Sequence, residues 1–178
     1  MPETQTRKAE AFKALHQGEA FVIPNPWDAG SARVFEALGF TALATTSSGF
    51  AFTLGRLDGE VTLDELADHV RALDEASTLP VSVDLENGFG PAPEDAARAV
   101  ARAAEVGAVG GSIEDFDPAG RLYDRDHAAE RIAAAREATA NLGFPFTLTA
   151  RAVSMNGKPR PAVASRAAAI RSAAWSRS

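Results

Sequence analysis

The sequence predicts an α/β fold of the (β/α)₈ barrel type, of which this chain contains about five β/α units. Apolar runs of strand length alternate with segments of helical periodicity along the chain. The strand segments are nearly continuous apolar runs, as in parallel strands that are buried on both faces. Polar residues cluster directly after these strands, and the loops after the strands share one face of a (β/α)₈ barrel.

The first 50 residues are expected to form two helices and two strands. Residues 7–17 have apolar side chains at helical spacing, which predicts a short helix. Residues 20–24 and 41–46 are apolar runs of strand length, and the segment 31–38 between them has helical periodicity. The small residues at 47–49 then predict a loop.

Three further strands and three further helices continue the alternation. A helix is expected from Thr62, because Glu65 stands at capping-box spacing and apolar residues recur on one face. Pro93 begins another helix, which runs to Gly107, and a third is expected over 124–141. The remaining strands are predicted at 81–86, 108–113 and 145–149.

Composition excludes several classes of function. With 178 residues, 46% of them hydrophobic, the chain can form one domain with a core. A net charge of −6 argues against nucleic acid as a partner. The absence of cysteine excludes disulfides, thiolate metal sites and cysteine nucleophiles. We expect no membrane partner and a cytoplasmic location, because no apolar run approaches about 20 residues and no apolar signal segment begins the chain.

The charge is unevenly distributed along the chain. From Arg151 to the C-terminus there are six basic residues and no acidic one, whereas residues 1–150 carry all 24 acids and 12 bases. We therefore predict a partial barrel domain over 1–152 and a basic, Ala/Ser/Arg-rich tail over 153–178 that is not part of the native barrel. A frameshift after about Ala152 is one hypothesis for this change, and reading the gene in the other two frames would test it.

Two acids mark the end of the third predicted strand. Residues two apart on a strand point the same way, so the carboxylates of Asp84 and Glu86 are expected to converge. Two such anions repel each other unless a proton or a hard dication lies between them, and Mg²⁺ prefers oxygen ligands with several retained waters. A pair of solvated loop acids is the alternative interpretation.

Five motifs occur in order at the spacing of a barrel: Asn25–Arg33, Ala44–Phe50, Val83–Gly90, Ser112–Asp115 and Leu148–Ala152. Together they resemble the isocitrate lyase and phosphoenolpyruvate mutase superfamily, and most closely its phosphoenolpyruvate phosphonomutase-like branch. The likeness covers roughly residues 8 to 152. It implies a TIM barrel enzyme that depends on Mg²⁺, or alternatively Mn²⁺. Such an enzyme makes or breaks a C–C or P–C bond in a small 2-oxo or carboxylate-bearing acid, through an enolate-like intermediate.

The resemblance also implies roles for individual residues. Asp84 is implied as the principal metal carboxylate, while Glu86 and Glu114 hold the waters of the ion. Asp58 completes the acidic ring, and Asp58 and Arg151 are the implied catalytic residues.

Substrate contacts follow from the same motifs. Ser48 and Gly49 are implied to offer a hydroxyl and a backbone N–H to the carboxylate or phosphoryl oxygens of the substrate. Arg151 is implied to bind the other end of the substrate. The alternative interpretation of the Ser47–Gly49 segment is a tight turn before a helix.

Departures from the family pattern leave other functions open. Lyases of the superfamily bear a Lys-Cys-Gly-His type loop after the fourth strand, whereas residues 116–123 contain neither lysine nor cysteine. Glu86 stands where many members have Asp, and Val153 where an acid is usual. A non-catalytic remnant and a module that binds small dicarboxylates or metal are therefore alternative hypotheses. Because an open barrel exposes strand edges, we also expect self-association.

Smaller expectations concern side chains outside the acidic cluster. Trp27 is expected to serve packing, and Asp28 to cap the helix that follows it. His16, His69 and His127 lie on predicted helices away from the strand ends and are expected to be solvated.

Overall fold

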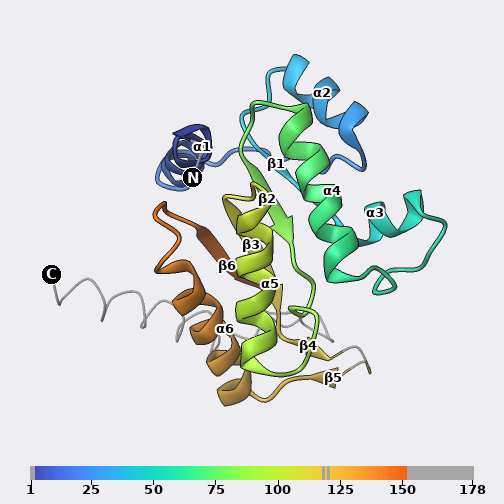
Figure 1. The fold of residues 1–178 in the computed structure, drawn as a ribbon, viewed down its shortest axis with the longest axis vertical. Helices are drawn as coiled ribbons and strands as arrows, with labels where there is room; N and C mark the ends of the chain where they lie inside the picture. Colours follow the sequence, from blue (N-terminus) through green and yellow to red (C-terminus); the bar gives the residue numbers. More distant parts are fainter. Residues whose placement is uncertain (1–2, 118, 120, 152–178) are drawn as a thin grey trace, which may run out of the picture.

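The computed structural model of the chain describes residues 3–117, 119 and 121–151. Its centre is a sheet of four parallel strands in the order β1-β2-β3-β6 (Figure 1). These strands are β1 (Leu43–Ala44), β2 (Val81–Asp84), β3 (Gly110–Glu114) and β6 (Thr147–Arg151). The predicted α/β class with parallel strands is confirmed. The predicted tail, 153–178, lies outside the described residues.

Helices precede and connect the strands. They are α1 (Glu3–Leu15), α2 (Ala29–Ala37), α3 (Ser47–Thr53), α4 (Leu63–Ala76), α5 (Pro93–Glu105) and α6 (Arg125–Thr139). Figure 1 shows α4, α5 and α6 side by side across one face of the sheet. A small antiparallel hairpin, β4 (Phe116–Asp117) and β5 (Arg121–Leu122), extends beyond the carboxyl end of β3.

Local sequence signals explain where the helices begin. Thr62 and Glu65 form the predicted capping box of α4, and Pro93 occupies the first turn of α5. Asp28 caps α2 as expected, because its carboxylate accepts a hydrogen bond from the backbone N–H of Ser31 at 2.6 Å. These caps fix the points at which the chain leaves the strand ends.

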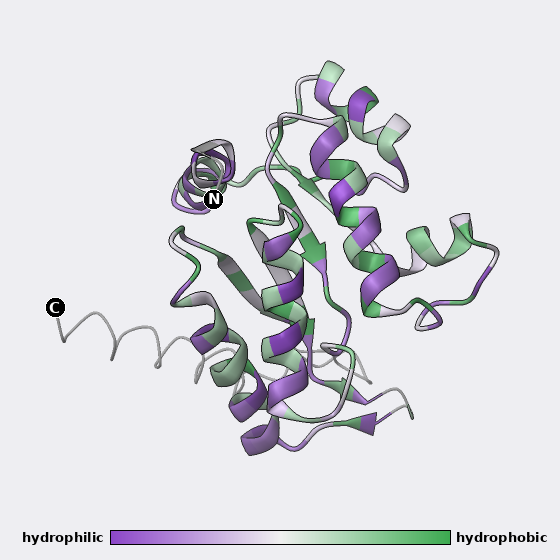
Figure 2. Ribbon diagram, viewed as in Figure 1, coloured by the Kyte–Doolittle hydropathy of each residue, from purple (hydrophilic) through white to green (hydrophobic). Residues whose placement is uncertain are grey.

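The core lies between the sheet and the three covering helices. Val83 of β2 and Ile113 of β3 are buried against a row of small and branched residues on α5, among them Val100. Figure 2 shows hydrophobic residues in β2 and hydrophilic residues along the outer faces of α4, α5 and α6. Burial of this apolar surface provides the main free energy that holds the helices on the sheet.

Two predictions about local structure are wrong. Residues 20–24 are not a strand in the structure; the carbonyl of Pro24 accepts one hydrogen bond from the N–H of Ala44. Pro24 and Pro26 have no N–H to donate, which limits a β ladder here. Residues 47–49 are the first turn of α3 rather than a loop, because the side chain of Thr46 caps that helix.

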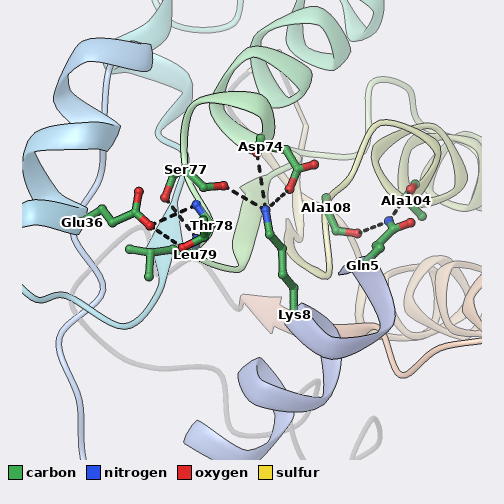
Figure 3. A network of polar contacts seen from close by, with 9 residues as sticks. All are labelled: Gln5, Lys8, Glu36, Asp74, Ser77, Thr78, Leu79, Ala104 and Ala108. Carbon is green, nitrogen blue, oxygen red and sulfur yellow. Dashed lines mark hydrogen bonds and ion pairs between the residues drawn. The ribbon is translucent and has the colours of Figure 1, made fainter. Parts of the chain in front are cut away.

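Helix α1 is attached to the end of the sheet opposite the hairpin by buried polar contacts (Figure 3). The amide of Gln5 donates to the carbonyl oxygens of Ala104 and Ala108, at 2.8 and 3.3 Å. The ammonium group of Lys8 donates to the carboxylate of Asp74 at 2.6 Å and to the carbonyl of Ser77 at 3.0 Å. These bonds attach α1 to the carboxyl ends of helices α4 and α5 and to the residues that follow them.

We expect Lys8→Met to lower the free energy of unfolding by about 2 kcal/mol, because the substitution leaves the Asp74 carboxylate without its buried cation. Urea denaturation would measure the change. Lys13→Met, on the exposed side of the same helix, is the matched control. Equal unfolding midpoints for the two variants would contradict this role of Lys8.

Candidate active site

A cavity of about 1310 Å³ opens at the carboxyl ends of the strands. Six of the seven residues predicted to form the site line this cavity: Ser48, Asp58, Asp84, Glu86, Glu114 and Arg151. Gly49 does not line it. The fold therefore brings to one cavity an arginine and acids that lie between 37 and 93 positions before it in the sequence.

Asp84, the last residue of β2, is held by backbone groups. Its own N–H donates to the hydroxyl of Thr45 at 2.8 Å. Its carboxylate accepts hydrogen bonds from the N–H groups of Ser47, at 3.2 Å, and Glu86, at 3.1 Å. These bonds fix the orientation of the carboxylate and leave further lone pairs for a ligand.

Glu86 lines the cavity, but its backbone geometry differs from the predicted strand. Its backbone has φ +49°, so it belongs to a turn and not to the strand, and strand alternation does not orient it. The carbonyl of Glu86 accepts a hydrogen bond from the N–H of Glu114 at 2.8 Å, which ties this turn to β3. Burial raises the pKa of Glu86 to about 7, and the negative charges of Asp58, Asp84 and Glu114 add to the effect.

Glu114 and Arg151 face each other on neighbouring strands. They are register partners at the ends of β3 and β6, and their side chains form an ion pair with a nitrogen–oxygen distance of 2.7 Å. Burial raises the pKa of the Glu114 carboxyl, Arg151 opposes the rise, and the charges of Asp84 and Asp58 add to it. The acids thus repel one another within one region of the cavity.

The donor set of the cavity fits a hydrated dication. Carboxylate oxygens are hard ligands, and Mg²⁺ is usually bound by one or two carboxylates together with waters. Within residues 3–117, 119 and 121–151, no three His, Asp or Glu side chains are grouped closely enough to hold a metal directly. The arrangement is therefore compatible with one direct carboxylate and water-mediated contacts to others. A dication would offset the repulsion among the acids, which adds to the effect of burial on the pKa of Glu86.

Ser48 and Gly49 differ in their surroundings. Ser48 lines the cavity, and its hydroxyl lies 3.3 Å from that of Thr46. Gly49 is buried, and a Cβ at this position would lie 2.6 Å from the ring of Trp27. Its N–H donates to the hydroxyl of Thr46 at 3.4 Å. Gly49 thus permits close packing under Trp27, and the predicted substrate contact by Gly49 stays a prediction.

Asn87 lines the cavity and was not singled out from the sequence. The residue is 8% exposed. Its side-chain oxygen accepts a hydrogen bond from the N–H of Phe89 at 3.1 Å, and its side-chain nitrogen has no hydrogen-bond partner in the described part of the chain. The sequence signal that could have identified Asn87 is a side-chain amide directly after the two acids Asp84 and Glu86.

His69 is not solvated, contrary to expectation. It lies on the buried face of α4, is 8% exposed, and stacks on the ring of Phe50 in α3 with a centroid distance of 3.9 Å. Burial lowers the pKa of His69 to about 4, whereas the charge of Asp28 acts to raise it. The neutral ring supports the helix that begins at Ser47.

This burial of His69 predicts a loss of stability in acid. The folded-state pKa lies below the ordinary value of 6.5, so the unfolded chain binds the proton more tightly, and stability falls as pH decreases from about 6.5 to about 4. We expect the protonation of His69 to lower the free energy of unfolding by about 2 kcal/mol between pH 7 and pH 4.5.

Urea denaturation of the wild type and of His69→Leu at both pH values would isolate that cost, with His16→Leu as the exposed control. His69→Leu is expected to lose less stability in acid than the wild type. Equal losses in the two proteins would contradict the buried neutral state of His69.

A parallel α/β sheet with acids and an arginine at the carboxyl ends of its strands has the layout of a (β/α)₈ barrel, in which this face carries the loops after the strands. The family model described as phosphoenolpyruvate phosphomutase matches residues 12–175, so the chain belongs to that family. The fold is accordingly of the (β/α)₈ barrel type, of which the described residues form part.

Three proteins illustrate the similarity. A crystal structure of a candidate lyase/mutase from Burkholderia cenocepacia J2315 is 55% identical, with a TM-score of 0.83 over 84% of this chain and 55% of that one. Oxaloacetate decarboxylase from Bradyrhizobium sp. (strain BTAi1) is 37% identical over 61% of this chain and 38% of the relative. A structure of oxaloacetate acetylhydrolase with its product oxalate is 27% identical, with a TM-score of 0.81 over 93% of this chain and 60% of that one.

The chain spans less than half the length of the curated relatives it matches. Among the helices of the described residues, none has the length and apolar character needed to cross a membrane.

Proposed function

We propose that the chain carries Mg²⁺-dependent lyase or mutase chemistry, with Mn²⁺ as an alternative ion. The substrate is a small 2-oxo or carboxylate-bearing acid, in which a C–C or P–C bond next to a carboxylate is made or broken through an enolate-like intermediate. The observation that carries this proposal is the convergence of Asp84, Glu86, Glu114 and Arg151 on one cavity. Membership of the phosphoenolpyruvate phosphomutase family supports it.

In this proposal the acids hold the ion. Asp84 is the direct ligand, because backbone N–H groups already orient its carboxylate, and Glu86 and Glu114 bind the waters of the ion. Asp58 completes the negative ring from the loop after α3. When bound, the ion supplies a Lewis acid that favours negative charge on the substrate oxygens.

Two further residues bind the substrate. The planar guanidinium of Arg151 matches a carboxylate bidentately, and its ion pair with Glu114 fixes the direction from which it acts. The hydroxyl of Ser48 donates to a carboxylate or phosphoryl oxygen at the other end of the substrate. A preorganised set of charges of this kind is commonly the largest contribution to rate enhancement.

Turnover of oxaloacetate with Mg²⁺ is the first test, since two of the similar proteins are named for that acid. Substituted malic acids and phosphonopyruvate extend the panel to C–C and P–C cleavage. We expect turnover that EDTA abolishes and Mg²⁺ restores. Saturable Mg²⁺ binding without turnover of any member of the panel would contradict an enzymatic function.

The second candidate function is a non-catalytic remnant or a binding module for small dicarboxylates or metal. It is favoured by the segment 116–123, which lacks the lysine and cysteine of the superfamily's lyases. A rise in melting temperature with oxalate and Mg²⁺, without turnover, would support this function.

We also propose that the chain self-associates. Among the strands of the described sheet, β6 pairs only with β3, so within the described residues its outer edge is free. The outer edge of β1 is bonded only at Ala44 in the described part, by Pro24 and Asn25. Val22, Phe52 and Leu57 are 70%, 54% and 69% exposed. Light scattering during size-exclusion chromatography would test this, and a monomer whose melt is cooperative and independent of concentration would contradict it.

A further inference from the structure

A buried arginine of α6 binds the turn that follows β2. Arg131 is 1% exposed, and its guanidinium donates to three backbone carbonyls of residues 87–92. One terminal nitrogen donates to the carbonyls of Gly90, at 2.7 Å, and Ala92, at 3.0 Å. The other donates to the carbonyl of Asn87. One side chain thus satisfies the carbonyls of a turn that has no regular ladder of its own.

The backbone of this turn requires such support. Glu86 and Phe89 are not glycines, yet they have φ +49° and +58°. Left-handed backbone at such residues persists when the surrounding structure determines it. Gly88 between them has φ +83°, and a Cβ there would lie 3.0 Å from the Cα of Ala96 and 3.1 Å from the guanidinium of Arg131. The turn therefore packs closely against Arg131, and a side chain at position 88 would not fit.

The same face of α6 holds the turn at a second point. His127, one helical turn before Arg131, has its Nε2 2.8 Å from the carbonyl oxygen of Pro91. The ring of Tyr123 contacts both side chains: its centroid is 4.8 Å from the Arg131 guanidinium carbon and 5.1 Å from the centroid of His127. Tyr123 follows the β4–β5 hairpin and lines the large cavity, as Asn87 does.

We infer that Arg131 is a positioning residue, which fixes the turn after β2 so that Glu86 and Asn87 are held at the cavity, and which joins that turn to Tyr123 at the end of the hairpin. The inference rests on the proposed function only for its effect on turnover. A lysine cannot replace this arginine, because a single ammonium nitrogen cannot donate to three carbonyls spread along a turn as a planar fork does.

Amide hydrogen exchange tests the inference directly. The N–H groups of Gly88, Phe89 and Ala92 donate to Leu85, Asn87 and Asp95 respectively, so the turn has measurable protection. In Arg131→Lys and Arg131→Met we expect these amides to exchange about ten-fold faster relative to the amides of β2 and β3. Arg125→Lys, an exposed arginine at the start of α6 that pairs with Asp126, is the control and should leave the ratio unchanged.

The ratio of the exchange rates of the turn amides to those of the β2 and β3 amides separates a local effect on the turn from a general loss of stability. Equal acceleration of turn and sheet amides, or unchanged turn amides, would overturn the inference, and Arg131→Lys keeps the test available if Arg131→Met does not fold. If the wild type turns over a 2-oxo acid, Arg131→Lys should also lower kcat about ten-fold with little change in KM. Wild type without turnover would contradict the proposed function and leave the exchange result intact.

Discussion

Asp84→Ala should lower kcat/KM for the 2-oxo acid substrate by about 10³-fold and remove its dependence on Mg²⁺. Asp84 lines the cavity, and its carboxylate is already oriented by the N–H groups of Ser47 and Glu86. In the proposed mechanism its loss removes the direct ligand of the ion, and single preorganised electrostatic groups are worth about 10²–10³-fold in rate. Steady-state kinetics over a series of Mg²⁺ concentrations would measure the effect.

The fold of Asp84→Ala should survive, because the substitution also relieves repulsion from Glu86, whose pKa the charge of Asp84 helps to raise. A circular dichroism melt checks this. Asp68→Ala, an exposed acid of α4 that pairs with Arg71, is the control for loss of a carboxylate. A folded Asp84→Ala protein with unchanged Mg²⁺ dependence would show that another group binds the ion.

Arg151→Lys should lower kcat/KM by about 10²-fold, even though the positive charge is retained. The guanidinium pairs with Glu114 at 2.7 Å and borders the cavity. Lysine provides a point charge in place of a planar fork, so the bidentate geometry toward a carboxylate is lost. Arg151→Gln should lower kcat/KM further, because it also removes the positive charge that opposes the rise in the pKa of Glu114.

Kinetics with oxaloacetate and with a substrate that lacks the second carboxylate would separate binding from chemistry. We expect the loss in Arg151→Lys to be smaller for the shorter substrate. Arg71→Lys, in the surface pair with Asp68, is the matched control. Equal losses for both substrates would indicate that Arg151 acts only by orienting Glu114.

The sequence predicted the strands and caps that carry the acids. Asp84 and Glu114 end apolar runs whose length and composition suit buried parallel strands, and parallel strands bring their carboxyl ends to one edge. The start of α4 followed from Thr62 and Glu65, because a capping box depends on a fixed local spacing. These are local signals, and tertiary contacts did not override them.

Two features that the sequence did not predict, the burial of His69 and the position of Glu86, depend on tertiary contacts. His69 is buried because Phe50, 19 positions earlier, stacks on its ring. The position of Glu86 depends on a turn held by Arg131, which is 45 positions away, and not on strand alternation. Residues 20–24 have the hydrophobicity of a strand, but they do not form one in the structure. The missing N–H groups of Pro24 and Pro26 limit the hydrogen bonds that a β ladder needs.

The position of the bound ion tests the central claim most directly. Crystals grown with Mn²⁺ and oxalate should show one anomalous scattering peak per chain within direct coordination distance, about 2 Å, of a carboxylate oxygen of Asp84, with Glu86 and Glu114 contacting its waters. The oxalate should lie between this peak and Arg151. A peak elsewhere, or none at saturating Mn²⁺, would contradict a metal-dependent site formed by these three acids.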